Sequence, residues 1–163
     1  MPSSIGPDLV ALLPRLRRFA LTLCRSPSRA DDLVQGACER ALANAGSWTP
    51  GTRFDAWMFR ILRNHWIDNL RRLKVEGVIE DVTAHKQLIG DPGEEPIFNR
   101  LTLAEVQRAI EGLPQEQREV LVLVCVEDLS YRETADVLSV PIGTVMSRLA
   151  RARKRLVEIT AAA

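Results

Sequence analysis

Residues 130–155 read SYRETADVLSVPIGTVMSRLARARKR, and this stretch decides the fold. Ser130 and Glu133 have the spacing of a capping box, in which each side chain binds the backbone N–H of the other residue where a helix begins. Pro141 falls in a tight turn after that short helix, and helical spacing resumes over 142–159. Two helices joined by a short turn are typical of a helix-turn-helix, whose second helix enters the major groove of DNA.

The second of these helices has an apolar face and a polar face, because successive residues are about 100° apart around a helix. The apolar face comprises Val145, Leu149, Ala152, Leu156 and Ile159. The polar face comprises Thr144, Ser147, Arg148, Arg151, Lys154 and Arg155. Arginine binds guanine through two hydrogen bonds and basic side chains hold phosphates, so the polar face predicts a DNA contact. A basic face that only meets solvent is the alternative, and the charge pattern alone does not separate the two.

Charge is distributed in blocks along the chain. The 163 residues contain 22 Lys+Arg and 21 Asp+Glu, a net charge of +1. Residues 1–73 hold 11 Arg against 6 acids, and residues 142–163 hold 5 bases against 1 acid. The two segments between them, 74–98 and 99–141, each carry a net charge of −4. Two basic zones separated by acidic ones are consistent with two contacts to a polyanion.

Motifs of enzymes, metal sites and membrane proteins are missing from the sequence. Cys24, Cys38 and Cys125 form no C-x-x-C or Cys/His pattern, and neither a nucleophile–base pair nor a phosphate loop is recognisable. We therefore expect no metal, no cofactor and no enzymatic activity. The longest apolar run, Val120–Val126, is far shorter than a bilayer span, and the N-terminus does not resemble a secretion signal. These features predict a cytoplasmic protein without a membrane contact of its own.

Helical spacing predicts an all-α protein. Besides the helix-turn-helix, helices are expected over 8–25, 28–45, 54–73, 102–111 and 115–126. Pro14 predicts either a kink in the first helix or its start, and Ser28 is expected to cap the second helix. Residues 74–98 lack periodicity and are rich in Gly and Pro, which predicts a flexible linker. The expected architecture is two small helical domains, 1–73 and 99–163, joined by that linker.

Four stretches resemble one protein family. Residues 130–155 resemble region 4 of bacterial sigma factors of the sigma-70 family, and residues 113–121 resemble the helix before it. Residues 30–41 resemble the helix of region 2 that binds core RNA polymerase, and residues 54–72 resemble the helix that recognises and melts the −10 element. The most similar group is the extracytoplasmic-function (ECF) class. The resemblance implies a protein that binds core polymerase, directs it to promoters through −10 and −35 contacts, and assists DNA opening.

The resemblance also assigns roles to residues. A polymerase-binding surface is expected from Asp31, Asp32, Leu33, Val34, Gln35, Glu39 and Arg40. Contact with the −10 DNA is expected from Trp48, Arg53, Arg60, Arg63, Asn64, Asp68, Arg71 and Arg72. Contact with the −35 DNA is expected from the polar face defined above. Gly36 departs from the family, which usually has Glu there.

Each assignment has an alternative. Asp31 and Asp32 near a helix N-terminus also compensate the helix dipole. Trp48 lies in the polar loop 46–53, where its ring stacks on an unpaired base or folds back as a lid on the core. The acidic segment 74–98 either imitates RNA in a polymerase channel or is only a spacer.

The resemblance implies three partners: core RNA polymerase, promoter DNA and a separate anti-sigma factor. Two rival interpretations remain open. One is a transcriptional regulator that binds duplex DNA without polymerase, and the other is a helical adaptor that binds only proteins. The basic faces favour DNA binding over the adaptor.

Overall fold

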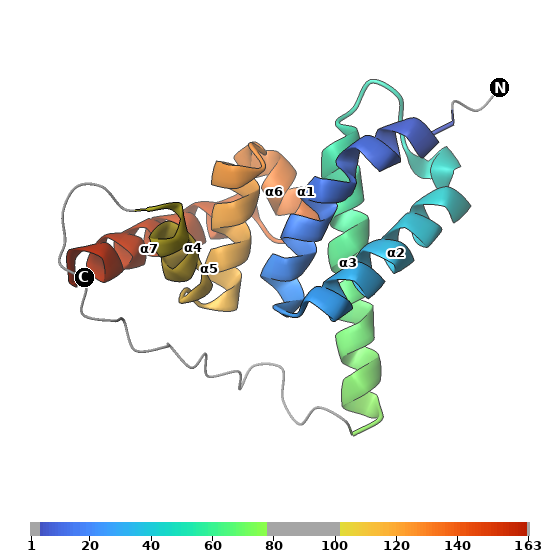
Figure 1. Ribbon diagram of the computed structural model, residues 1–163. Helices are drawn as coiled ribbons and strands as arrows, with labels where there is room; N and C mark the ends of the chain where they lie inside the picture. The colour runs from blue at the N-terminus through green and yellow to red at the C-terminus, as the bar shows by residue number, and fades with distance from the viewer. Residues whose placement is uncertain (1–3, 78–101, 163) are drawn as a thin grey trace.

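The computed structural model describes residues 4–77 and 102–162, and in these ranges every regular element is helical (Figure 1). The N-terminal helices are α1 (Gly6–Cys24), α2 (Pro27–Ala43), the short 3₁₀ turn η1 (Ala45–Ser47) and α3 (Phe54–Val75). The C-terminal helices are α4 (Leu103–Glu111), α5 (Gln115–Leu121), the π-helical turn η3 (Val122–Val126), α6 (Tyr131–Leu138) and α7 (Ile142–Ala162). The predicted all-α fold is confirmed. Residues 78–98 of the predicted linker lie outside the described ranges, and α3 continues through residues 74 and 75.

Local hydrogen bonds explain several helix starts. In the capping box of α6, the Glu133 N–H donates to Ser130 Oγ at 3.0 Å, and the Ser130 N–H donates to Glu133 Oε1 at 2.8 Å. Thr102 and Glu105 form the same reciprocal pair at α4. The expected cap of α2 is wrong by two residues, because Ser26 is its N-cap. Pro27 takes the first helical position, where a missing N–H costs nothing.

Pro14 lies inside α1, which begins at Gly6 and runs on past the proline. Of the two alternatives drawn from the sequence, a helix start at Pro14 is therefore excluded. Asp8 in the first turn suits the positive end of the helix dipole. At the other end, Arg25 takes a left-handed conformation with φ of 59°, and its N–H donates to Leu21 O.

The helices pack in two groups that also touch each other. Within the N-terminal group, α1 packs on α2 and α3, and Phe19 meets Phe59 edge to face at 5.4 Å. Within the C-terminal group, α7 packs on α5 and α6. Helix α1 also packs against α5, and α3 packs against α6 (Figure 1). One cluster of buried apolar side chains therefore includes members of both groups.

Candidate nucleic-acid interface

Helix α7 separates its two faces as the sequence predicts. Val145, Leu149 and Ala152 are buried against the neighbouring helices. On the opposite face Ser147, Arg151 and Lys154 are exposed, while Thr144, Arg148 and Arg155 are half-buried. The second helix of the helix-turn-helix therefore presents hydroxyl and basic groups to solvent over its first four turns.

Arg148 is the most constrained member of this polar face. Its side chain is 19% exposed, and its Nη2 lies 3.6 Å from Glu116 Oε1 on α5. Glu116 is itself well exposed, so the pair is a weak surface contact that a guanine or a phosphate can replace. The Ser147 hydroxyl donates to Thr144 O at 3.1 Å, and it remains an acceptor for a donor on DNA.

On α2, some of the residues expected to bind polymerase are exposed and others are buried. Asp31, Asp32, Gln35 and Glu39 are exposed. Leu33 and Val34 are 4% and 9% exposed and belong to the core. The expectation that these two side chains face a partner is corrected, because they fill the apolar side of an amphipathic helix.

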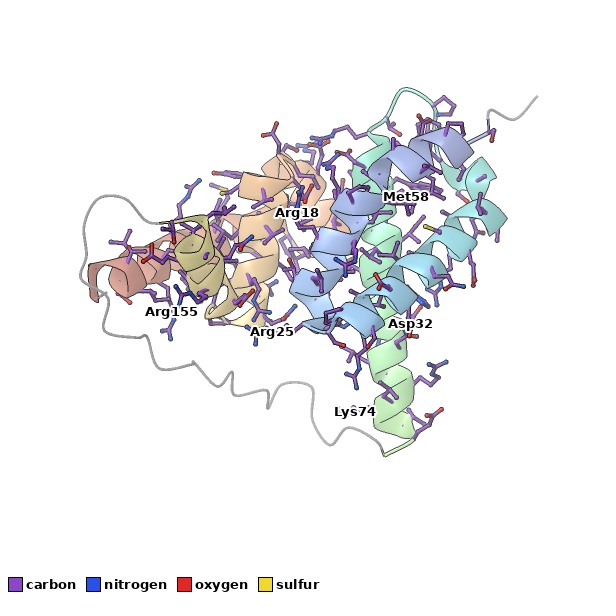
Figure 2. The ribbon with its side chains drawn as sticks, in the orientation of Figure 1. Arg18, Arg25, Asp32, Met58, Lys74 and Arg155 are labelled. Carbon is purple, nitrogen blue, oxygen red and sulfur yellow. The ribbon has the colours of Figure 1, made fainter. Side chains whose placement is uncertain are left out.

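Two charged side chains of α2, Asp31 and Arg40, make ion pairs with neighbouring helices. Asp31 accepts from Arg17 Nε at 2.9 Å on α1. Arg40, which is half-buried, donates to Asp68 Oδ2 at 2.9 Å and so links α2 to α3. Asp32 lies on α2 and Arg155 on α7, at opposite sides of the molecule in Figure 2. The expected polymerase surface and the expected −35 surface are therefore separate.

Gly36 is explained by its neighbour His65. A Cβ at position 36 would lie 2.1 Å from His65 Nε2, far inside any contact distance. The imidazole of α3 thus rests on the backbone of α2. Burial lowers the pKa of His65, and the positive charge of Arg40 lowers it further, so the ring is neutral at pH 7. The departure from the family at position 36 has a steric cause that the sequence did not reveal.

The expected −10 residues on α3 form an exposed polar face. Arg60, Asn64, Asp68, Arg71 and Arg72 are all exposed. A shallow hollow next to this face is lined by Arg40, Asn44, Ser47, Trp57, Ile61 and Asn64. Amides, a hydroxyl and an indole around one hollow offer hydrogen bonds and a stacking surface to an unpaired base.

Trp48 packs on its own protein in this structure. Its ring meets Phe54 edge to face at 5.3 Å, and Phe54 in turn contacts Trp57 at 5.7 Å. The indole Nε1 is buried without a hydrogen-bond partner among the described residues. This arrangement matches the lid alternative, and stacking on a base requires the ring to leave Phe54.

Two expected −10 residues are engaged elsewhere. Arg53 donates to Asp55, to Glu133 Oε1 at 3.2 Å and to Asp128 O at 2.9 Å. Glu133 is part of α6, and Asp128 lies in the turn before α6. No local pattern in the sequence indicates these contacts, because the partners are 75 and 80 residues away along the chain.

Arg63 is held in a similar way. Its Nε lies 3.5 Å from Glu119 Oε1 on α5, and its Nη1 donates to Leu138 O on α6 at 3.3 Å. In this conformation Arg63 is half-buried between α3 and the C-terminal helices.

Within residues 4–77 and 102–162, no group of three His, Cys, Asp or Glu side chains is placed to hold a metal ion. No helix in the same ranges is long and apolar enough to cross a membrane. Burial raises the pKa of both Cys24 and Cys38, which disfavours the reactive thiolate.

Comparison with known proteins identifies the family. Residues 9–75 match Sigma-70 region 2, and residues 103–156 match Sigma-70 region 4. The chain is 39% identical over 156 residues to the ECF RNA polymerase sigma factor EcfG of Rhodopseudomonas palustris (strain TIE-1), covering 96% of this chain and 84% of that protein. The chain belongs to the ECF sigma factors. As a sigma factor, it directs RNA polymerase to specific promoters.

Two further relatives are also sigma factors. It is 36% identical over 151 residues to SigM of Mycobacterium tuberculosis (strain H37Rv), covering 89% of this chain and 71% of that one. Its fold is similar to the sigma factor RpoE of Bartonella quintana, solved in complex with the anti-sigma factor NepR. That similarity has a TM-score of 0.74 and 32% identity, and it covers 95% of each chain.

Proposed function

We propose that the two groups of helices divide promoter recognition between them. The N-terminal group, which comprises the described residues 4–77, binds core polymerase through α2 and the −10 element through α3. The C-terminal group, residues 102–162, binds the −35 element through α7. The observation that carries this proposal is the exposed polar face of α7 opposite a buried apolar face.

For the −35 element, the argument rests on the geometry of α7. The helix follows a short turn after α6, and its exposed Ser147, Arg151 and Lys154 are spaced along one face. A helix of this kind fits the major groove with its N-terminal part at the base edges. Arg148 and Arg151 serve base recognition, while Lys154 and Arg155 hold phosphates.

For the −10 element, the argument rests on α3 and the hollow beside it. Asn64 lines the hollow and is exposed, so its amide can pair with a base edge. Arg60, Arg71 and Arg72 are exposed on the same helix and can hold the sugar-phosphate backbone. Trp48 adds a stacking surface when its ring leaves Phe54.

For core polymerase, the exposed polar part of α2 is the proposed surface. Asp31, Asp32, Gln35 and Glu39 form a mixed charged and amide face that suits a protein interface. The side chains of Leu33 and Val34 support this face from the core instead of touching the partner.

We also infer that the chain acts in the cytoplasm without catalysing a reaction of its own, and that a separate anti-sigma factor restrains it. The Bartonella quintana relative, at 32% identity, was solved with such a factor.

A gel-shift experiment tests the proposal. The probe is duplex DNA from upstream of the chain's own gene, incubated with core polymerase, with the chain, or with both. The proposal predicts a strong specific shift only with both components. A specific shift by the chain alone would instead support a regulator that works without polymerase, and no shift with both would contradict the proposal.

A further inference from the structure

Helix α7 carries exposed apolar side chains beside the polar face that is proposed to bind DNA. Ile142 is 46% exposed and Met146 is 52% exposed, although both side chains are large and apolar. Ala150 is exposed as well. Because these residues are spaced four apart, they form one apolar strip along the first turns of α7, the red helix in Figure 1.

The apolar strip lies on the side of α7 that is turned away from the other helices. An isolated exposed apolar side chain is ordinary on a protein surface, but neighbouring ones on a helix mark a surface that another molecule covers. Within the described part of the chain, α7 packs on α4, α5 and α6, and the side chains that it buries are Val145, Leu149 and Ala152. The apolar strip is therefore accessible to a partner.

The position of the apolar strip identifies this partner as duplex DNA. Met146 is followed directly by Ser147, and Ala150 is followed directly by Arg151, so the strip adjoins two residues of the polar face. Both Ser147 and Arg151 are exposed. In a helix-turn-helix, the N-terminal residues of the second helix contact base edges in the major groove. A pose that brings Ser147 to the bases brings Met146 into the same groove.

The residues that border Met146 on the exposed side are small. Gly143 lies one turn before it and Ala150 one turn after it, and both are exposed. The backbone of Gly143 is helical, and a Cβ at this position would meet no described atom within 4 Å. Neither the conformation nor the packing of the chain thus requires a glycine here. A bare backbone with open space above it allows another molecule to approach closely.

The chemistry of the major groove indicates what an apolar side chain reads there. Of the four bases, thymine alone presents a methyl group on the major-groove edge, next to its O4 acceptor. Apolar contact with this methyl group is one of the ways in which proteins distinguish thymine. The thioether of Met146 is flexible and polarisable, so it packs well against a small apolar group.

We propose that Met146 is a specificity-determining residue that reads the C5-methyl group of a thymine in the −35 element, with Ile142 extending the apolar contact. The proposal rests on the function proposed above, in which α7 binds the −35 element. The contact adds a preference that hydrogen bonds from Ser147 and Arg151 do not supply, because thymine and uracil offer the same hydrogen-bonding groups.

Replacement of thymine by uracil tests the methyl contact. The holoenzyme is assembled from core polymerase and the full chain, and its affinity is measured for the upstream duplex used in the gel shift. Each thymine of the −35 region, on either strand, is replaced in turn by deoxyuridine, which removes only the methyl group. We expect one of these probes to bind about fourfold more weakly than the thymine duplex, which is the scale for burying one methyl group.

Substitution of Met146 should abolish this difference. Met146→Ala should bind the thymine duplex about fourfold more weakly and should no longer distinguish it from the uracil probe. Met146→Leu keeps an apolar side chain and should retain the distinction. The matched control is Val157→Ala, which removes an apolar side chain that is 66% exposed near the other end of α7. This control should keep the full penalty for uracil.

Three results overturn the proposal. They are the absence of a uracil penalty at every thymine in the wild type, an unchanged penalty in Met146→Ala, and a −35 region without thymine on either strand. Circular dichroism checks that the variants remain helical. If Met146→Ala unfolds, Met146→Gln decides the result, because glutamine favours helices and keeps the length of the side chain without its apolar end.

Salt dependence separates the methyl contact from a phosphate contact. The slope of log affinity against log salt reports how many phosphates the protein neutralises. Met146→Ala should leave this slope unchanged, whereas Lys154→Ala should reduce it by about 1. A slope reduced in Met146→Ala as in Lys154→Ala overturns the methyl contact.

The same measurements distinguish failure of this inference from failure of the proposed function. A holoenzyme that does not bind the thymine duplex specifically contradicts the proposed function, and this inference with it. Specific binding that is weakened by Arg151→Ala but is insensitive to the methyl group overturns this inference alone.

Discussion

The imidazole of His65 occupies the space that any side chain at position 36 would need, with its Nε2 2.1 Å from where a Cβ would stand. Helices α2 and α3 therefore approach closely at this point, and the pair is a fixed feature of the N-terminal group.

This relationship predicts the outcome of paired substitutions. Gly36→Ala should bring less than the gain of about 1 kcal/mol expected for an interior helical glycine, because its Cβ forces the His65 ring to swing away. In a chain that also carries His65→Ala, Gly36→Ala should bring the full gain, since the obstructing ring is gone. Thermal unfolding of the single variants and the double variant measures the coupling. Additive effects would show that the two side chains do not compete for one space.

The cap of α6 gives a second prediction. Ser130→Ala should cost about 1 kcal/mol, because it leaves the Glu133 N–H without its 3.0 Å acceptor. Ser28→Ala is the matched control, since the structure assigns the cap of α2 to Ser26. Chemical denaturation compares the two. A larger loss for Ser28→Ala than for Ser130→Ala would contradict this account of the helix starts.

The polar face of α7 gives a third prediction. Arg148→Ala and Arg151→Ala should each weaken −35 recognition by roughly 1–3 kcal/mol, about 5- to 150-fold, and leave core binding intact. Arg153→Ala is the control, because Arg153 is exposed like Arg151 but lies off this face. Promoter affinity of the holoenzyme and a pull-down with core polymerase give the two readouts. Equal loss of core binding would reject the separation of roles.

Trp48 gives a fourth prediction. Trp48→Ala should slow promoter opening more than it weakens the closed complex, because the ring is proposed to stack on an unpaired base. Phe54→Leu is the control, since it removes the aromatic partner at 5.3 Å and keeps the indole. Permanganate reactivity of promoter thymines reports opening. Unchanged reactivity in Trp48→Ala would leave this residue only as a lid on the core.

The carboxylate of Asp55 gives a fifth prediction, on pH. Burial alone would raise the pKa of Asp55, but hydrogen bonds from Arg53 and Arg15 outweigh it and hold the pKa below the ordinary value of 3.8. A folded-state pKa below the unfolded one adds stability above the unfolded value, and this stability is lost as the pH falls through the folded value.

Asp55→Asn should therefore be less stable than the wild type by about 1–3 kcal/mol at pH 7, and the difference should shrink as the pH falls below about 4. Urea unfolding at a series of pH values measures it. A difference that stays constant down to pH 2 would show that the ionised carboxylate is not what matters.

Local chemistry made much of this structure predictable. The capping box of Ser130 and Glu133 and the two faces of α7 involve residues within a few turns of each other, and the structure has both. The burial of Leu33 and Val34 was missed, because the resemblance named a whole helix and did not separate its faces. The pairing of Arg15 with Glu127 spans 112 residues, and nothing in the local pattern of either residue indicates it.

The central claim is that the chain gives core polymerase its promoter specificity through two separate DNA contacts. Run-off transcription tests it most directly, with core polymerase and a template that carries the DNA upstream of the chain's own gene. The account predicts a defined transcript that needs the chain and is strongly reduced by Arg151→Ala or by Asn64→Ala. A transcript of equal yield without the chain, or none with it, would contradict the account.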